Sequence, residues 1–362
     1  MPLNLDAKIM THKNVSRREF GLCGAAATLS PLLAKAESIA SSWETEWLKP
    51  KGLKQGDTIA LVAPAGPADR AVVLSYKQQL EQSGLRVQYD ERMLDRKKEY
   101  LAGNDTERAD ELNNAIRNPQ VRAIFPVRGG YGLTRILDQI DFASLRSDPK
   151  IITGYSDLTA LHLAIARKSR VISFHSPMPM SNLAQGHLPE HAYSQQSFER
   201  MLFADRFPKA MAGEAIPVPP TEPIKTIHGG KTQGRLMGGN LTLVCATMGT
   251  PYAIEATGVI LFLEDVNEAP YRVDRLLSQL RLAGILDSVA GIVLGQFTNK
   301  EPNDAQDIDR VVSEVMKQID CPVIANFPVG HVPKNATLPH GALVELDANR
   351  GVLTLLEEPC VR

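Results

Sequence analysis

The sequence predicts an α/β protein of two domains, an N-terminal domain with a parallel sheet and a smaller, β-rich α/β domain at the C-terminus. Three observations lead to this prediction. Apolar runs of strand length alternate with helical stretches over residues 58–174, and the alternation returns after Gly234. Between these regions the chain loses its rhythm and becomes rich in Pro and Gly. Its 362 residues are enough for two domains of ordinary size.

The N-terminal domain is expected to contain five short strands separated by helices. The second of these helices has a clear start signal, with Asp105 or Thr106 as the cap and acidic residues in its first turn. Pro126 is the one strand breaker inside the apolar runs. The expected strands are 58–63, 85–89, 123–127, 151–152 and 171–174, and the expected helices are 70–83, 105–116 and the stretch after Asp157.

The C-terminal domain is expected to be richer in strands. Its clearest helix is amphipathic, because apolar side chains at positions 273, 276, 277 and 280 form one stripe. The expected strands are 259–263, 291–294, 322–325, 343–346 and 352–356. The predicted division of the chain is a signal peptide over 1–36, an N-terminal domain over 54–215, a linker over 216–233 and a C-terminal domain over 234–358.

The composition excludes several classes of protein. Hydrophobic residues make up 43% of the chain and charged residues 22%, as in a soluble globular protein. The formal net charge is -1, so no overall basic field would attract nucleic acid. No stretch approaches the ~18 consecutive apolar residues of a membrane span. Metal-ligand spacings such as H-E-x-x-H do not occur, and we expect neither a metal nor another cofactor.

The first residues have the three-part layout of an export signal. A polar segment with Arg17 and Arg18 precedes a weakly apolar run over 20–34, and residues 34–36 (AKA) match the A-x-A cleavage pattern. Residues 16–20 (SRREF) are similar to a twin-arginine signal. We therefore expect a periplasmic protein. The other interpretation is an amphipathic helix with an incidental Arg pair.

The most informative segment lies at residues 151–161, where an apolar strand runs through Gly154-Tyr155-Ser156-Asp157 directly into a helix. Such a turn would hold the Ser156 hydroxyl at a helix N-terminus, which is the geometry of a nucleophile elbow. The second glycine of G-x-S-x-G is missing, because position 158 is Leu. The alternative is a Ser-Asp helix cap, and the spacing alone does not decide between them.

A nucleophilic serine needs a base, and two histidines qualify by position. His331 follows a turn just after an expected strand, and His175 directly follows another strand. The residues alone leave both open. The acid best placed to orient the base is Glu264, which ends an apolar strand where an unpaired carboxylate would be costly. Its other interpretation is an acid facing solvent or Arg272.

Several motifs in a fixed order resemble the LD-carboxypeptidase family, which also includes the microcin C self-immunity peptidases. The resemblance covers about residues 55–357. It is carried by Arg128-Gly-Gly-Tyr-Gly132, Gly154-Tyr-Ser-Asp157, Gly238-Gly-Asn-Leu241, Leu263-Glu-Asp265 and Gly330-His331.

The resemblance implies a serine carboxypeptidase whose catalytic residues are Ser156, Glu264 and His331, with acid and base supplied by the C-terminal domain. The implied substrate is a peptidoglycan-derived tetrapeptide that loses its terminal D-alanine. The runner-up within the class is a peptidyl-nucleotide antibiotic. A runner-up from another class is a two-domain protein that binds cell-wall peptides without cleaving them.

The remaining expectations concern the groups around the nucleophile. We expect the amides of Asp157 and Gly130 to form the oxyanion hole. Arg128 and Tyr131 are the expected substrate-binding residues, Arg128 for the terminal carboxylate because of its charge. A salt bridge that supports the turn is the alternative for Arg128. A peptide substrate is the expected partner, nucleic acid is not, and a homodimer is left open.

Overall fold

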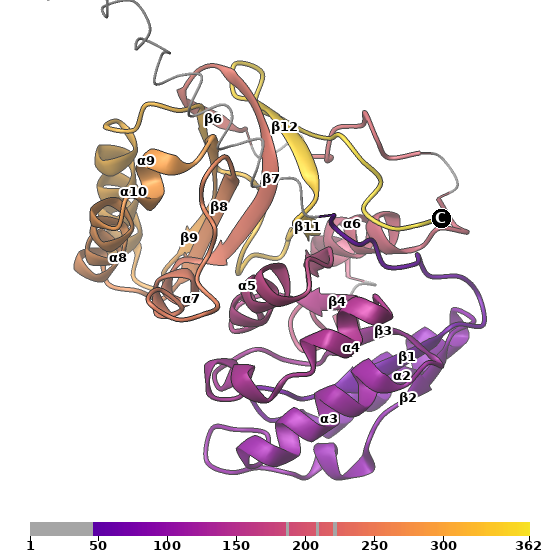
Figure 1. Ribbon diagram of the computed structural model, residues 1–362. Helices are drawn as coiled ribbons and strands as arrows, with labels where there is room; N and C mark the ends of the chain where they lie inside the picture. Colours follow the sequence, from indigo (N-terminus) through magenta and orange to yellow (C-terminus); the bar gives the residue numbers. More distant parts are fainter. Residues whose placement is uncertain (1–45, 186–187, 208–209, 220–222) are drawn as a thin grey trace, which may run out of the picture. The chain divides into compact units, whose positions relative to one another are not determined.

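The computed structural model describes residues 46–185, 188–207, 210–219 and 223–362. Within these residues the chain forms two sheets, one of six strands and one of seven (Figure 1). The predicted signal peptide over residues 1–36 lies outside the described residues.

The first sheet has the strand order β11-β5-β4-β3-β1-β2. Five of its strands are parallel, and β11 runs antiparallel to β5 at one edge. The strands are β1 (Thr58–Val62), β2 (Arg86–Gln88), β3 (Val121–Pro126), β4 (Ile151–Gly154), β5 (Ser173–His175) and β11 (Leu338–His340). Pro126 is the last residue of β3, where the loss of one ladder hydrogen bond is tolerated.

Both faces of this sheet are buried, as a parallel sheet requires. All five residues of β1 are buried, and successive side chains point to opposite faces. Ile59 and Leu61 join one hydrophobic cluster, whereas Ala60 and Val62 join another. The helices of this half are α2 (Arg70–Gln82), α3 (Asp105–Arg117), α4 (Phe142–Ser147), α5 (Leu158–Lys168) and α6 (Ala192–Leu202).

The start of α3 differs from the predicted one by a residue. Its cap is Asn104, not Asp105 or Thr106. The Asn104 side chain accepts a hydrogen bond from the amide of Glu107, and the Glu107 carboxylate accepts one from the amide of Asn104. This reciprocal capping box satisfies two amides at once, which a cap at Asp105 would not do.

The second sheet has the order β13-β12-β7-β8-β9-β10-β6. Its four central strands are parallel, while β12, β13 and β6 are antiparallel to their neighbours. The helices α8, α9 and α10 are grouped beside β8 and β9 (Figure 1). The elements are β6 (Lys225–His228), β7 (Lys231–Asn240), α7 (Leu241–Ala246), β8 (Ile260–Val266), α8 (Pro270–Leu282), α9 (Ile285–Ser288), β9 (Gly291–Thr298), α10 (Pro302–Met316), β10 (Val323–Ala325), β12 (Leu343–Asp347) and β13 (Val352–Leu355).

The predicted two-domain α/β architecture, with a parallel-rich N-terminal sheet and a mixed C-terminal sheet, is confirmed. The strands of the two sheets do not divide at the predicted domain boundaries, however. β6 and the first residues of β7 lie inside the range 216–233 that was predicted as a linker. β11 lies inside the C-terminal range, yet it pairs with β5 of the first sheet.

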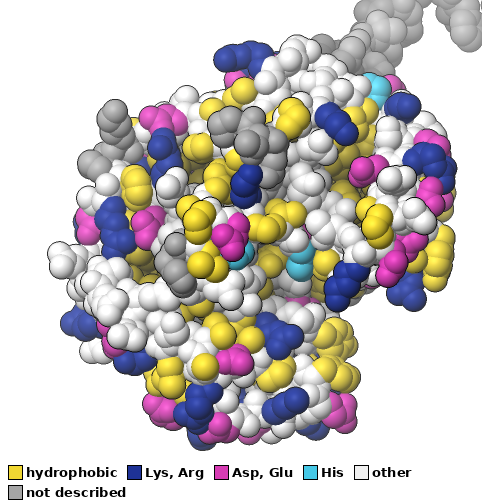
Figure 2. Space-filling view, turned by 180° about the vertical axis from the view of Figure 1, so that it is seen from behind, with side chains coloured by type: hydrophobic (Ala, Val, Ile, Leu, Met, Phe, Trp, Pro, Cys, Tyr) yellow, Lys and Arg dark blue, Asp and Glu magenta, His cyan; other side chains and the backbone are white. Residues whose placement is uncertain are grey.

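The surface agrees with the nearly neutral composition. On the face shown in Figure 2, basic and acidic side chains are interspersed and do not gather into large areas of one sign. Among the described helices, none combines the length and apolar character that a membrane crossing needs.

Candidate active site

Ser156 lies in the turn between the end of β4 and the start of α5. Its φ of 64° falls in the left-handed region, which side chains other than glycine rarely adopt. The preceding Gly154 has a φ of 127°, and a Cβ there would lie 2.7 Å from the Leu158 side chain. A serine held in a strained strand-to-helix turn is the expected form of a nucleophile elbow.

Glu264 and the partly exposed His331 form a hydrogen-bonded pair next to this turn. The His331 Nδ1 donates to Glu264 Oε2 across 2.8 Å, and Glu264 is fully buried at the carboxyl end of β8. Gly295 and Gly330 make room for the carboxylate, because a Cβ on Gly330 would lie 2.9 Å from Oε2 and one on Gly295 3.2 Å from the Glu264 Cβ. The predicted alternative partner, Arg272, instead pairs with Glu268.

The hydrogen bond to Glu264 uses Nδ1 of His331 and leaves Nε2, the other ring nitrogen, without a bond to the carboxylate. Burial raises the pKa of Glu264, although His331 opposes that rise. Burial also disfavours the charged form of His331, but the hydrogen bond and charge of Glu264 outweigh it and raise the His331 pKa above 6.5. With Nδ1–H bonded to the carboxylate, Nε2 is the atom that can accept a proton.

Contacts between the two halves of the chain bring His331 beside the serine turn. The ring of Tyr155, the residue before Ser156, lies 4.8 Å from the His331 ring, measured between centroids. Asn240 is opposite Glu264 in the β7–β8 register, and its backbone N–H donates to the Thr159 hydroxyl in α5. The end of β7 is therefore hydrogen-bonded to the helix that begins after the nucleophile turn.

His175, the other histidine left open by the sequence, has a different environment. It is fully buried, and neither ring nitrogen has a hydrogen-bond partner among the described residues. Its ring contacts Tyr155 and Phe262 edge-on. Burial, together with neighbouring histidines, lowers its pKa well below 6.5. The structure pairs His331, and not His175, with a carboxylate.

The glycine-rich turn after β3 lies against the serine turn. A Cβ on Gly129 would lie 3.1 Å from the Ser156 Cβ. Gly130 has a φ of 104°, a backbone conformation that glycine adopts without strain. Within the described part of the chain, neither the amide of Gly130 nor that of Asp157 donates to a protein acceptor. Both predicted oxyanion donors are therefore available to a ligand.

The Asp157 side chain has a function that the sequence did not predict. It makes no capping hydrogen bond to α5, so the alternative of a Ser-Asp cap does not hold for this carboxylate. Its Oδ2 instead accepts the amide of Leu133 at 2.9 Å, which ties the glycine-rich turn to the nucleophile turn. Burial raises the pKa of Asp157 to about 6, although the Leu133 amide and Arg108 lower it.

Arg128 and Tyr131 lie on the same turn. Arg128 is exposed, and its Nη1 donates weakly to the Pro67 carbonyl at 3.4 Å. No acidic residue in the described ranges pairs with Arg128, so the predicted alternative of a supporting salt bridge is not observed there. Tyr131 is exposed and packs edge-on against Tyr100, with the ring centroids 5.7 Å apart.

Comparison with known proteins identifies the family. Models of the LD-carboxypeptidase N-terminal and C-terminal domains match residues 59–176 and 233–346. The chain belongs to the LD-carboxypeptidase family. A probable murein peptide carboxypeptidase of Bacillus subtilis is 35% identical to this chain over 297 residues, which cover 81% of this chain and 90% of that protein.

Solved structures agree with this assignment. Muramoyltetrapeptide carboxypeptidase from Oxalobacter formigenes is 31% identical and superposes with a TM-score of 0.68, covering 82% of this chain and 97% of that one. A microcin C7 self-immunity protein is 26% identical, with a TM-score of 0.76 and coverage of 86% and 99%. The predicted family and the predicted class, a serine-type carboxypeptidase, are confirmed.

The described residues of this chain hold no group of three or more His, Cys, Asp or Glu side chains that could bind a metal ion. The polar groups next to the Ser156 turn are the His331 ring, the Glu264 carboxylate bonded to it, and the backbone amides of Gly130 and Asp157.

Proposed function

We propose that this LD-carboxypeptidase removes the terminal D-alanine from peptidoglycan-derived tetrapeptides through Ser156, His331 and Glu264. The observation that carries the proposal is the 2.8 Å bond from His331 to the buried carboxylate, next to a turn that holds Ser156 at a φ of 64°. The substrate class follows from the relatives named murein peptide carboxypeptidase and muramoyltetrapeptide carboxypeptidase.

In the proposed reaction, His331 Nε2 takes the hydroxyl proton of Ser156 as the oxygen attacks the scissile carbonyl. Glu264 stabilises the imidazolium that forms. The imidazolium then gives its proton to the amine of the leaving D-alanine, and an acyl-enzyme remains on Ser156. Water, deprotonated by the same histidine, hydrolyses the ester and restores the enzyme.

The negative charge on the attacked carbonyl oxygen needs donors that are already in place. The amides of Asp157 and Gly130 are proposed for this task, and loss of one such donor commonly costs about 10²–10³-fold in rate. Arg128, an exposed cation on the same turn, is proposed to bind the carboxylate of the terminal D-alanine, with Tyr131 beside it.

The direct test is to incubate the purified protein with a defined muramoyl tetrapeptide and to measure D-alanine release. The wild type should release D-alanine, and Ser156→Ala should not, although it should still bind the peptide. Binding of the tetrapeptide without release by the wild type would instead support a non-catalytic cell-wall peptide-binding protein.

A second candidate substrate is a peptidyl-nucleotide antibiotic. The self-immunity relative, with a TM-score of 0.77, has been solved in complex with aspartyl sulfamoyl adenosine. The same compound serves as the competing substrate. Faster release of aspartate from it than of D-alanine from the tetrapeptide would favour self-immunity over the muropeptide function.

We also propose that the protein acts in the periplasm after export through the twin-arginine route. The proposal rests on Arg17-Arg18 and on residues 34–36 (AKA), which lie outside the described residues. Changing both arginines to lysine should leave precursor in the cytoplasm. Unchanged export of that double variant would contradict the assignment.

A further inference from the structure

Helix α3 carries charged side chains that the catalytic proposal does not use. Arg108 is fully buried and Glu111 nearly so. A buried charge is unfavourable unless it is paired and hydrogen-bonded, so the partners of these two residues indicate what they do.

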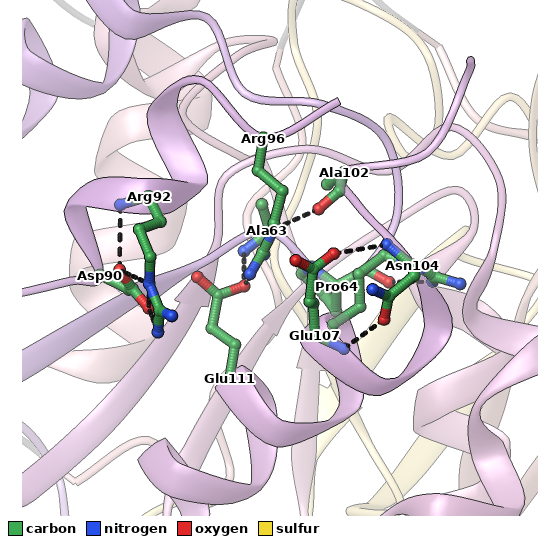
Figure 3. Close-up of polar contacts among 10 residues, drawn as sticks. Ala63, Pro64, Asp90, Arg92, Arg96, Ala102, Asn104, Glu107 and Glu111 are labelled. Atoms are coloured by element: carbon green, nitrogen blue, oxygen red, sulfur yellow. Dashed lines mark hydrogen bonds and ion pairs between the residues drawn. The ribbon is translucent and has the colours of Figure 1, made fainter. Parts of the chain in front are cut away.

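Glu111 and Arg96 connect two loops, a first loop that follows β1 and a second loop that precedes α3 (Figure 3). The Oε2 of Glu111 accepts the amide of Ala63, just after β1, and also accepts Arg96 Nη2 at 2.9 Å. Arg96 in turn donates its Nε to the carbonyl of Ala102. Through the amide of Ala102, the second loop also bonds to the carbonyl of Ala65.

Arg108 joins the first of these loops to the glycine-rich turn. A single nitrogen, Nη1, donates to the carbonyls of Pro64 at 2.6 Å and Gly132 at 2.9 Å. The other terminal nitrogen pairs with Asp105, which also binds Arg135. The fit is close, because a Cβ on Gly132 would lie 2.7 Å from Nη1.

Both ends of this connection lead to the nucleophile. The amide of Gly66, two residues after Pro64, donates to the carbonyl of Gly129 at 2.9 Å. Gly129 packs against Ser156. On the other side of the turn, the amide that follows Gly132 donates to the Asp157 carboxylate. The turn at residues 128–132 is thus held at both ends.

We propose that Arg108 is a positioning residue, which fixes the glycine-rich turn so that the amide of Gly130 faces the oxyanion formed at Ser156. Arg108 acts through the carbonyls of Pro64 and Gly132 and does not touch the substrate. The inference rests on the proposed function, because it assumes a developing oxyanion on a carbonyl attacked by Ser156.

A guanidinium suits this position better than an ammonium. Its planar fork reaches two carbonyls and a carboxylate in fixed directions, whereas Lys offers a point charge on a flexible stem. Arg108→Lys therefore keeps the charge but loses the fixed geometry, and Arg108→Met loses both. Arg117→Met is the matched control, because Arg117 lies on the same helix with an exposed side chain.

The experiment measures the reactivity of Ser156 with a fluorophosphonate, whose phosphoryl oxygen uses the same donors as the substrate carbonyl. The end-point labelling gives the fraction of competent sites, and the rate gives the reactivity of each site. Arg108→Met should lower the rate per site about 10²-fold with full end-point labelling, as for the loss of one oxyanion donor. Arg108→Lys should fall between it and the wild type, and Arg117→Met should match the wild type.

The release of D-alanine gives an independent readout. A group that orders an oxyanion donor acts in the transition state, so kcat should fall while KM stays within about threefold. Reduced end-point labelling with an unchanged rate per site would mean a merely structural role and would overturn the inference. If Arg108→Met does not fold, Arg108→Lys decides, and a wild-type rate in that variant overturns the inference.

Failure of the proposed function gives a different result. A wild type that is labelled at Ser156 but releases no D-alanine contradicts the proposed substrate, and the labelling rates still decide the role of Arg108. A wild type that is not labelled at Ser156 overturns both.

Discussion

Replacing Glu264 by Gln tests the coupling of acid and base. The variant keeps the shape of the side chain but removes the charge that faces His331 across 2.8 Å. The charges of a carboxylate and an imidazolium are spread over their groups, so their centres lie farther apart than the two bonded atoms. For two unit charges about 4 Å apart the attraction is about 4 kcal/mol at an effective dielectric constant of ~20. The imidazolium forms only as Ser156 loses its proton, so this attraction stabilises the transition state. Because ~1.4 kcal/mol is a factor of ten, we expect kcat to fall about 10³-fold with little change in KM.

The same substitution should move the pH dependence. As a general base, His331 must be neutral, so kcat/KM of the wild type falls as the pH drops through the His331 pKa. Glu264 raises that pKa above 6.5 against the opposing effect of burial. Without the carboxylate the pKa decreases, and the acid limb of the profile should move to lower pH.

The assay is D-alanine release from the tetrapeptide across the acid limb for the wild type, Glu264→Gln and Glu314→Gln. The last variant makes the same chemical change at an exposed position on α10 and should behave as the wild type. Full activity of Glu264→Gln would refute the reasoning. So would a loss of kcat with the acid limb unmoved, because the carboxylate would then not control the histidine.

Three further predictions concern the surrounding site. His331→Ala should lower kcat about 10⁴–10⁶-fold. His175→Ala removes a buried ring that has no carboxylate partner, so it should lower the melting temperature and reduce kcat far less than His331→Ala does. A larger loss of kcat in His175→Ala than in His331→Ala would contradict the choice of base. Gly330→Ala should lose at least about tenfold in kcat, because the new Cβ would displace Glu264, while Gly249→Ala, with open space around it, should not. Activity should survive EDTA and be lost on treatment with a fluorophosphonate; restoration of EDTA-treated protein by zinc would contradict a serine mechanism.

Local sequence patterns predicted the elements that carry the site. The turn at Gly154-Tyr155-Ser156 and the acid that ends an apolar strand were both visible, because strand length, glycine and a buried charge are local signals. The strand itself was predicted too short. β8 continues to Val266 because Glu264 and Asp265 are buried with partners, which no local pattern reveals.

Long-range pairings were beyond the reach of local patterns. His331 and His175 each follow an apolar strand, and only the fold shows that one of them meets Glu264, 67 residues away along the chain. The side chains of Asp157 and Glu111 were missed for the same reason, because their backbone partners lie 24 and 48 residues away. A linker was predicted where β6 lies, since a short edge strand that follows a Pro-rich segment has little apolar signal of its own.

The pairing of β11 with β5 has a consequence for the order of folding during synthesis. The edge of β5 receives its partner roughly 160 residues later along the chain. At about 5–20 residues per second, the ribosome needs on the order of ten seconds or more to make that length. During this interval the nascent first sheet ends in an unpaired strand, which is a template for wrong pairing with other chains. A truncated chain that stops before Leu338 would keep that edge open permanently, so aggregation should be its characteristic failure.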